Sequence, residues 1–352
     1  MPRLYRLRWP SQRPPLRSVC RRSPQASSRS RRRRIQQGTD TIAVYRSLRD
    51  VAYVEPNRRV QVSATPNDTY VGDQYALSRI RARRGWSEYG RLWRRQGGAA
   101  IAIIDSGIDV FHPELGGKLF DCRSFMTGTG LAAPGCQDSQ FHGTHVAGIA
   151  AGIANNRTGI AGVAFDAPIM VLQAINSSGY GFTADVAAAM VYAAKNRAKV
   201  ASYSFSSPES SRAERDAVAY AASRGVVQVG ATGNSGARGV QYPAGLSQVI
   251  AVGATNRRHK RAAFSTYGPQ VEVVAPGKGI LSTLPGAAVY GELSGTSMAA
   301  PHVAGLAALL RAKGYGAPRT RRLIRRGAND LGSAGRDAKY GYGRINVART
   351  LP

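Results

Sequence analysis

The sequence predicts an α/β fold in which a mostly parallel central sheet is covered by helices on both faces, giving three layers. From residue 97 onward, short apolar runs of strand length alternate with Ala-rich stretches of helical composition. Strands that alternate with helices in this way pair in parallel. Between residues 183 and 196, Val186, Met190 and Ala193 recur at spacings of four and three residues, which lines one face of a helix for packing on a sheet.

The apolar runs and the Ala-rich stretches define the expected elements. Strands are expected at residues 99–104, 169–174, 200–205, 225–229, 249–253 and 271–274. Helices are expected at residues 142–151, 183–196 and 212–223, and a further apolar helix starts at Ser297 and runs to about residue 310. In parallel sheets, functional side chains gather beyond the carboxyl ends of the strands.

Composition places the chain among globular proteins that fold around a hydrophobic core. Apolar residues make up 43% of its 352 residues, and only three residues are cysteine. Three cysteines are too few for a disulfide-dense scaffold. Because no apolar run approaches the ~20 residues that a membrane helix needs, no membrane partner is expected.

The positive charge is concentrated toward the ends of the chain. Lys and Arg number 49 against 20 Asp and Glu, and residues 1–39 contain twelve Arg and no acidic residue. Residues 1–40 are interpreted as a disordered, Arg-rich leader. The alternatives are a tail that binds nucleic acid and a wrongly assigned start of the chain. A secretory signal peptide needs an apolar stretch of about 7 to 15 residues, which this segment does not contain.

Three segments contain the residue types that catalysis by a serine nucleophile requires. Asp105 ends an apolar strand, His142 begins a helix of small residues, and Ser297 lies at the N-terminus of an apolar helix. A serine hydroxyl needs a base within hydrogen-bonding distance, and that base needs a carboxylate that fixes its tautomer. Each residue alone can be read as a helix cap or a buried histidine, but the three together favour a catalytic triad.

These three segments resemble the signature blocks of the subtilisin family of serine proteases, and the resemblance covers about residues 65–349. It implies a subtilisin-like fold and a serine endopeptidase that hydrolyses a broad range of proteins through an acyl-enzyme on Ser297. Asp105 would orient His142, which would act as general base and then as general acid. The order Asp, His, Ser along the chain is a known property of this family. The matching segments are residues 101–109, 142–148 and 294–305.

A fourth segment, residues 231–236, resembles the oxyanion-hole block of the family, with Asn234 as the side-chain donor. Such a donor acts with the backbone N–H of the nucleophile on the oxygen of the tetrahedral intermediate, and its loss is known to cost about 3 kcal/mol in this same family. The structural alternative is a turn, because Asn tolerates left-handed backbone. His145 and His302 match structural positions of the family, so neither is expected to be the base.

The resemblance also assigns residues that bind substrate. Residues 202–206 match an edge strand that pairs with the substrate backbone, with Ser204, Phe205 and Ser206 as the substrate-binding residues. Gly233 and Gln241 match the adjoining specificity pocket, and Gln241 stands where the family often has Gly. A polar floor favours small or polar side chains before the cleaved bond. The alternative for this segment is a solvent-facing loop.

Residues 155–164 resemble the calcium loop of the family. Asn156, Glu114 and loop carbonyls would supply part of the six to eight oxygen ligands that calcium prefers. Arg157 brings a cation into this loop, and an ordinary turn is the alternative. No organic cofactor is implied.

The resemblance suggests a secreted zymogen with its own inhibitory propeptide as a partner. Residues 41–64, with apolar runs at 42–45 and 51–54, resemble the end of that propeptide, and residues 65–352 resemble the mature catalytic domain. An extracellular location would favour a bridge between Cys122 and Cys136 over two free thiols. The competing interpretations of the whole chain are a non-catalytic or misfolded relative with a defective propeptide, and a basic protein associated with nucleic acid.

Overall fold

The computed structural model describes residues 66–89, 99–126, 128, 130–287 and 289–351, together with two short strands near the N-terminus. The chain divides into two units, Met1–Val62 and Ser63–Pro352. In the first unit, β1 (Val19–Arg21) pairs antiparallel with β2 (Val51–Val54). β2 coincides with an expected apolar run, whereas β1 lies inside the segment expected to be disordered. Apart from these two strands, the predicted leader (residues 1–40) and propeptide remnant (residues 41–64) lie outside the described residues.

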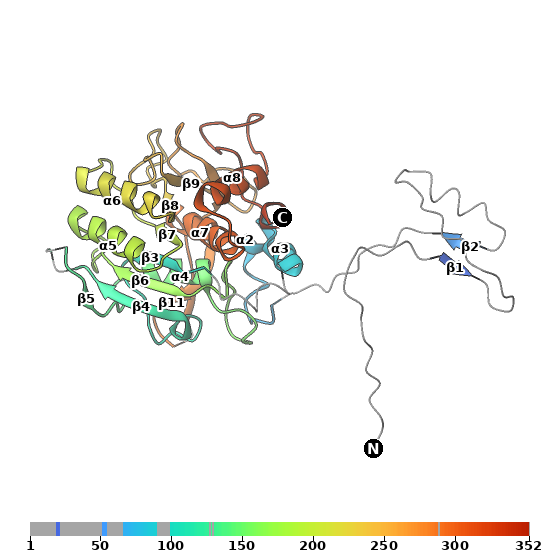
Figure 1. Ribbon diagram of the computed structural model, residues 1–352, viewed down its shortest axis with the longest axis horizontal. Helices are drawn as coiled ribbons and strands as arrows, with labels where there is room; N and C mark the ends of the chain where they lie inside the picture. Colours follow the sequence, from blue (N-terminus) through green and yellow to red (C-terminus); the bar gives the residue numbers. More distant parts are fainter. Residues whose placement is uncertain are drawn as a thin grey trace, which may run out of the picture. The chain divides into compact units, whose positions relative to one another are not determined.

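The second unit is built on an eight-stranded sheet with the order β10-β9-β8-β7-β3-β6-β4-β5 (Figure 1). Every neighbouring pair is parallel except β4 with β5, so the mostly parallel sheet is confirmed. The strands are β3 (Ile101–Asp105), β4 (Leu119–Ser124), β5 (Ala133–Pro134), β6 (Ile169–Gln173), β7 (Val200–Tyr203), β8 (Val227–Ala231), β9 (Val249–Thr255) and β10 (Val273–Pro276).

Helices cover both faces of this sheet (Figure 1). Ile101 and Ile103 of β3 pack into the core that contains α4 and α7, whereas Ala102 and Ile104 pack into the core that contains α5 and α6. Because successive side chains of a strand point to opposite faces, this division confirms the three layers. The helices are α2 (Tyr75–Arg79), α3 (Ala82–Tyr89), α4 (His142–Ala151), α5 (Thr183–Lys195), α6 (Arg212–Ser223), α7 (Thr296–Ala312), α8 (Ala317–Gly327) and α9 (Val347–Thr350).

The expected elements are present, with shifted limits where turns intervene. α4 and α6 begin and end as predicted. The strand expected from residue 225 begins at Val227, because Gly225 adopts a φ of 73° in the turn after α6. The sequence analysis missed β4, the short helices α2 and α3, the C-terminal helices α8 and α9, and an antiparallel hairpin of β11 (Ile280–Leu284) and β12 (Val289–Leu293). Among the helices that the structure describes, none has the length and apolar character required to span a bilayer.

A disulfide joins Cys122 of β4 to Cys136, as expected for the bridged form. The backbone carbonyl of Cys136 accepts a hydrogen bond from the N–H of Ile108 at 2.8 Å. The bridge therefore ties the outer part of the sheet to the turn that follows the central strand β3.

Replacing both bridged cysteines by serine should lower the free energy of unfolding by about 3 kcal/mol, because the bridge closes a loop of roughly fifteen residues in the unfolded chain. Urea denaturation of inhibitor-treated protein measures the loss. Cys20→Ser is the matched control and should leave the midpoint unchanged. Reductant should destabilise the wild type but not the double variant, and equal sensitivity of the two would contradict this assignment.

Candidate active site

A buried carboxylate and an imidazole meet at the carboxyl end of β3. Asp105, the last residue of this strand, is 1% exposed. Its Oδ1 accepts hydrogen bonds from the backbone N–H of Ser106 at 2.8 Å and from Nδ1 of His142 at 2.7 Å. Because Nδ1–H donates to the carboxylate, Nε2 is the nitrogen that remains to act as a base.

The charge of Asp105 determines the protonation of His142. Burial disfavours the imidazolium, but the neighbouring carboxylate and its hydrogen bond outweigh burial, with a further contribution from Asp138. The net effect raises the pKa of His142 above its ordinary value. The imidazole is thus poised to accept a proton and to stay charged beside Asp105.

Helix α4 reaches β3 because the residues at the junction are small. A Cβ on Gly143 would lie 2.0 Å from the carbonyl oxygen of Gly107, so only glycine permits this approach. The hydroxyl of Ser106 accepts from the N–H of Gly143 at 2.9 Å and donates to Asp138 at 2.9 Å. This packing fixes the first turn of α4, and with it the position of His142.

Asp138 is a residue of this site that the sequence analysis missed. Its carboxylate accepts hydrogen bonds from the backbone N–H groups of Gln140, Phe141 and Thr144. Gln140 and Phe141 lie just before α4 and Thr144 lies in its first turn, so Asp138 holds the start of the helix that carries the imidazole. The sequence feature that could have indicated this role is an acidic residue four positions before His142.

Ser297 lies in the first turn of α7 and is 9% exposed. Its Oγ donates to the backbone carbonyl of Ser204 at 2.7 Å, and the hydroxyl of Ser204 donates to the carbonyl of Ser297 at 3.0 Å. Among the described residues, the structure records no hydrogen bond from Ser297 to His142. The expected bond is therefore not made in this conformation, because the hydroxyl is bound to Ser204. Helices α4 and α7 nevertheless pack against each other.

Two hydrogen-bond donors border one space beside Ser297. Oδ1 of Asn234 accepts from the backbone N–H of Thr296 at 2.8 Å and from its hydroxyl at 2.9 Å. This leaves Nδ2 as the outward donor. A Cβ built on Gly295 would lie 3.4 Å from Nδ2 of Asn234 and 3.6 Å from the backbone nitrogen of Ser297. The two groups thus lie within reach of one common point, as an oxyanion hole requires.

The expected substrate-binding residues lie beyond the end of β7. β7 pairs with both β3 and β8, so Ser202 and Tyr203 lie in an interior strand and that part of the expected edge strand was wrong. The pairing of residues 204–206 with substrate stays a prediction. Ser204, Phe205 and Ser206 follow the last residue of β7, Tyr203. A backbone bridge between Ser207 and Tyr242 then joins this segment to the loop that contains Gln241.

The structure brings together Ser206, Gly233 and Gln241. The hydroxyl of Ser206 donates to Oε1 of Gln241 at 2.6 Å. A Cβ on Gly233 would lie 2.2 Å from the same oxygen, so the amide of Gln241 packs directly on this glycine. Gly233 has a φ of 103°, a conformation that glycine adopts without strain. The side chain of Gln241 therefore crosses the space between the two segments.

The expected calcium ligands Glu114 and Asn156 are in contact. Glu114 is fully buried and accepts from Ile160 N, the Tyr290 hydroxyl and Nδ2 of Asn156. Asp68, which the sequence analysis missed, is 3% exposed and accepts from two backbone N–H groups of the same loop. Burial, with a smaller contribution from the charge of Asp68, raises the pKa of Glu114 to about 7.

The side-chain oxygens of Asp68, Glu114 and Asn156 suit a hard cation such as calcium. Among the described residues, neither Asp68 nor Glu114 forms an ion pair. Turning the amide of Asn156 by half a rotation would present an oxygen in place of its nitrogen. The same part of the chain contains no group of three or more His, Cys, Asp or Glu side chains placed to hold a metal ion. Carbonyl oxygens would therefore have to complete the coordination, which calcium accepts readily.

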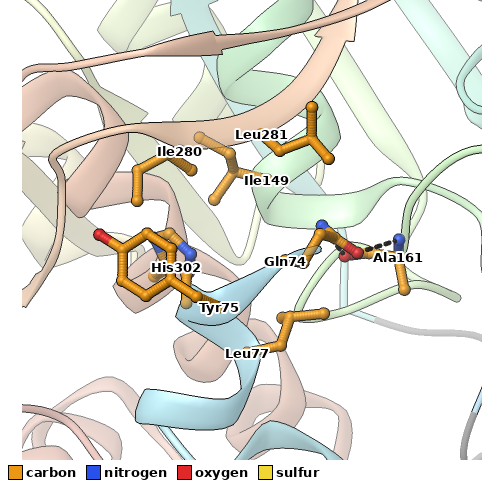
Figure 2. A pocket seen from close by; sticks show the side chains of 9 residues that line it. Gln74, Tyr75, Leu77, Ile149, Ala161, Ile280, Leu281 and His302 are labelled. Atoms are coloured by element: carbon orange, nitrogen blue, oxygen red, sulfur yellow. Dashed lines mark hydrogen bonds between the residues drawn. The ribbon is translucent and has the colours of Figure 1, made fainter. Parts of the chain in front are cut away.

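The other two histidines of the matching segments 142–148 and 294–305 are buried, and each lies within hydrogen-bonding distance of a backbone carbonyl. Nε2 of His145 is 3.1 Å from the carbonyl of Gly291, and Nδ1 of His302 is 2.9 Å from that of Met298. Burial lowers the pKa of each to about 4. Figure 2 shows His302 in a small pocket with Gln74, whose amide exchanges hydrogen bonds with the backbone of Ala161. Both histidines thus stay neutral inside the core.

Comparison with known proteins supports this assignment of the fold. A family model described as the Subtilase family matches residues 96–343. A protease structure from Pseudoalteromonas arctica PAMC 21717 superposes with a TM-score of 0.73 at 25% identity, covering 82% of this chain and 99% of that one.

Two characterised relatives are more similar in sequence. A thermophilic serine proteinase from Bacillus sp. (strain AK1) is 41% identical over 297 residues, which are 84% of this chain and 71% of the relative. Thermitase from Thermoactinomyces vulgaris is 40% identical over 288 residues, which are 82% of this chain and 99% of the relative. The chain therefore belongs to the subtilase family and is a serine endopeptidase.

Proposed function

We propose that Asp105, His142 and Ser297 form the catalytic triad of this endopeptidase. The observation that carries this assignment is the 2.7 Å hydrogen bond between Nδ1 of His142 and the buried carboxylate of Asp105. It orients Nε2 as the base and stabilises the imidazolium that forms when the base takes a proton. Ser297 supplies the nucleophile from the first turn of α7.

The reaction begins when the hydroxyl of Ser297 leaves the carbonyl of Ser204 and turns to His142. The imidazole removes its proton as Oγ attacks the substrate carbonyl. Nδ2 of Asn234 and the backbone N–H of Ser297 stabilise the resulting oxyanion. His142 then protonates the leaving amine, and a water molecule hydrolyses the acyl-enzyme by the same steps.

Protein substrates bind in extended form along residues 204–206. Backbone hydrogen bonds give affinity that depends little on sequence, which suits a broad range of protein substrates. Selectivity comes from the side-chain pocket, where Gln241 reaches Ser206 at 2.6 Å and packs on Gly233. With this space filled, the residue before the cleaved bond must be small.

A calcium ion would bind at Asp68, Glu114 and Asn156 and supply structural stabilisation of the loop. Its charge would neutralise two buried carboxylates. The chain's own residues already hold this loop through the hydrogen bonds of Glu114 and Asp68. No catalytic step involves this site.

Residues 41–64 are the remnant of an inhibitory propeptide, residues 1–40 precede it as an Arg-rich leader, and residues 65–352 are the mature enzyme, which acts outside the cell. The support is the sequence resemblance together with the disulfide of Cys122 and Cys136, a bond typical of oxidising compartments. Mass spectrometry of the mature N-terminus tests this division. The nucleic-acid interpretation and the non-catalytic interpretation are not favoured, because the family is that of active serine proteases.

Ser297→Ala should reduce kcat by about a millionfold, the loss already established for the nucleophile of this family. Hydrolysis of a chromogenic peptide and labelling by a fluorophosphonate measure the effect. Ser294→Ala is the control, because Ser294 is an exposed serine three residues away whose hydroxyl accepts from the N–H of Gly279. Labelling of the Ser297→Ala variant would remove Ser297 from its assigned role.

The rate should fall as the pH is lowered through the pKa of His142, because the imidazolium has no lone pair to accept the serine proton. Since the pKa of His142 is raised, the acid limb of kcat/KM should lie above the ordinary pKa of histidine. Asp105→Asn removes the charge that raises this pKa, so the acid limb should move to lower pH while kcat falls by about 10⁴. An acid limb that is unchanged in this variant would show that His142 is not the titrating base.

Gln241→Ala should widen the specificity pocket. We expect kcat/KM for substrates with Phe or Leu before the cleaved bond to rise by roughly tenfold to a hundredfold, because the amide that fills the pocket is removed. Substrates with Ala at this position should change little. Gln248→Ala, at an exposed glutamine after the same loop, is the matched control. Equal preference in the wild type for Ala and Phe would contradict a filled pocket.

A further inference from the structure

Arg344 is a buried arginine that has no acidic partner among the described residues. It is 7% exposed, and its Nε has no hydrogen-bond partner in that part of the chain. Its backbone is held on both sides, because it exchanges hydrogen bonds with Asn329 at 2.8 and 2.7 Å and bridges Val274 of β10. The position of this residue in the fold is therefore fixed. An arginine is almost never buried unless it is paired, since an uncompensated buried charge is costly.

Elsewhere in the same domain, one buried carboxylate pairs with two arginines. Glu272, whose side chain is 4% exposed, forms ion pairs with Arg321 and Arg325 of α8. One carboxylate there accepts several N–H donors from two guanidinium groups. Arg344 has no such carboxylate among the described residues.

The groups around Arg344 are also basic. Its Nη1 contacts both ring nitrogens of His259, with Nε2 at 3.1 Å. Burial, then the charges of Arg79 and Arg81, lower the pKa of Arg344. Burial, Arg344 and Arg79 lower the pKa of His259 in the same way. Ile80, between the two arginines, accepts from the N–H of Val347 at 2.8 Å, which holds the turn after α2 beside the C-terminal segment.

The turn after β9 extends this basic surface. Residues 257–261 are consecutively Arg, Arg, His, Lys and Arg. Oδ1 of Asn256 accepts from the N–H groups of Arg258 and Lys260 at 2.9 and 3.1 Å, so the turn has a defined shape. The acidic side chain that faces it in the described part of the chain is Glu292, which pairs with Arg257 at 3.5 Å, and both are exposed.

We propose that Arg344, with Arg79 and Arg81 at its rim, forms an anion site that binds a phosphate group. Guanidinium groups donate paired N–H bonds that match phosphate oxygens. A doubly charged tetrahedral anion carries more negative charge than a carboxylate and presents oxygens in several directions, so it can pair with more than one of the three arginines. The phosphate is either a free ion or one group of a longer phosphate chain that continues over residues 257–260. This site is separate from the hydrolytic reaction.

The test is a titration with inorganic phosphate at constant ionic strength, replacing chloride, with the thermal midpoint of unfolding as readout. The full chain carries Ser297→Ala so that self-cleavage plays no part. The midpoint should rise and saturate, because a ligand of the folded state stabilises it. Arg79→Gln should weaken the apparent affinity about tenfold, whereas Arg224→Gln, at an exposed arginine after α6, should leave it unchanged.

Arg344→Met separates an anion site from a purely structural role. If the guanidinium of Arg344 gains its counter-ion only when an anion binds, this variant should be at least as stable as the parent in chloride. It should also lose the response to phosphate. If Arg344 is structural, the variant should be less stable in chloride and should keep the response, which would overturn the proposal. Should Arg344→Met fail to fold, Arg79→Gln remains decisive, because equal affinities in Arg79→Gln and Arg224→Gln would also overturn it.

Tripolyphosphate distinguishes the two sources of the phosphate group. Binding tighter than that of inorganic phosphate, with the excess lost in Arg258→Gln, supports a longer phosphate chain. Equal affinity for the two probes supports a free ion. A response to neither probe, or a non-saturating response that is the same in all variants, would contradict the site.

Discussion

The buried charge of Asp105 is the constraint on which the geometry of the active site depends. A carboxylate that is 1% exposed needs hydrogen-bond donors, and Ser106 and His142 both donate to its Oδ1, whereas Oδ2 has no partner among the described residues. Because Asp105 ends a strand paired on one side by β6 and on the other by β7, the sheet fixes its position. The imidazole that neutralises it is fixed in turn, so His142 is oriented by the requirements of folding before any substrate binds.

The need to hold His142 against Asp105 also explains why the residues around this pair are small and are connected by hydrogen bonds and a disulfide. Gly143 and Gly107 let α4 begin almost in contact with the turn after β3. Asp138 accepts the N–H of Thr144 in the first turn of that helix and adds negative charge near the imidazole. The disulfide between Cys122 and Cys136 fixes the segment around Cys136, whose carbonyl accepts the N–H of Ile108 in the turn after β3. A change at any of these positions would alter the distance between carboxylate and imidazole without touching substrate.

Sequence reasoning succeeded where function is encoded locally and failed where it depends on neighbours in space. An apolar run that stops at Asp105 and a helix that starts at His142 are visible in the chain itself, and both lie as expected. The partners Asp138 and Asp68 were missed because their roles arise from backbone groups that only the fold brings to them. The interior position of Ser202 and Tyr203 was missed because apolar composition does not specify strand order, and β7 has a neighbour on each side.

In the mechanism that we propose, the hydrogen bond from Ser297 to the carbonyl of Ser204 connects substrate binding to activation of the nucleophile. A peptide that lies along residues 204–206 needs backbone acceptors, and the carbonyl of Ser204 is the first of them. An N–H group of the bound peptide therefore competes with the hydroxyl of Ser297 for the carbonyl oxygen of Ser204. A neutral hydrogen bond contributes only about 1 kcal/mol net, and the hydroxyl regains it on turning to His142, so the exchange is nearly balanced. Binding of the substrate backbone thus releases Ser297 toward its base at the moment when a carbonyl is in place to be attacked.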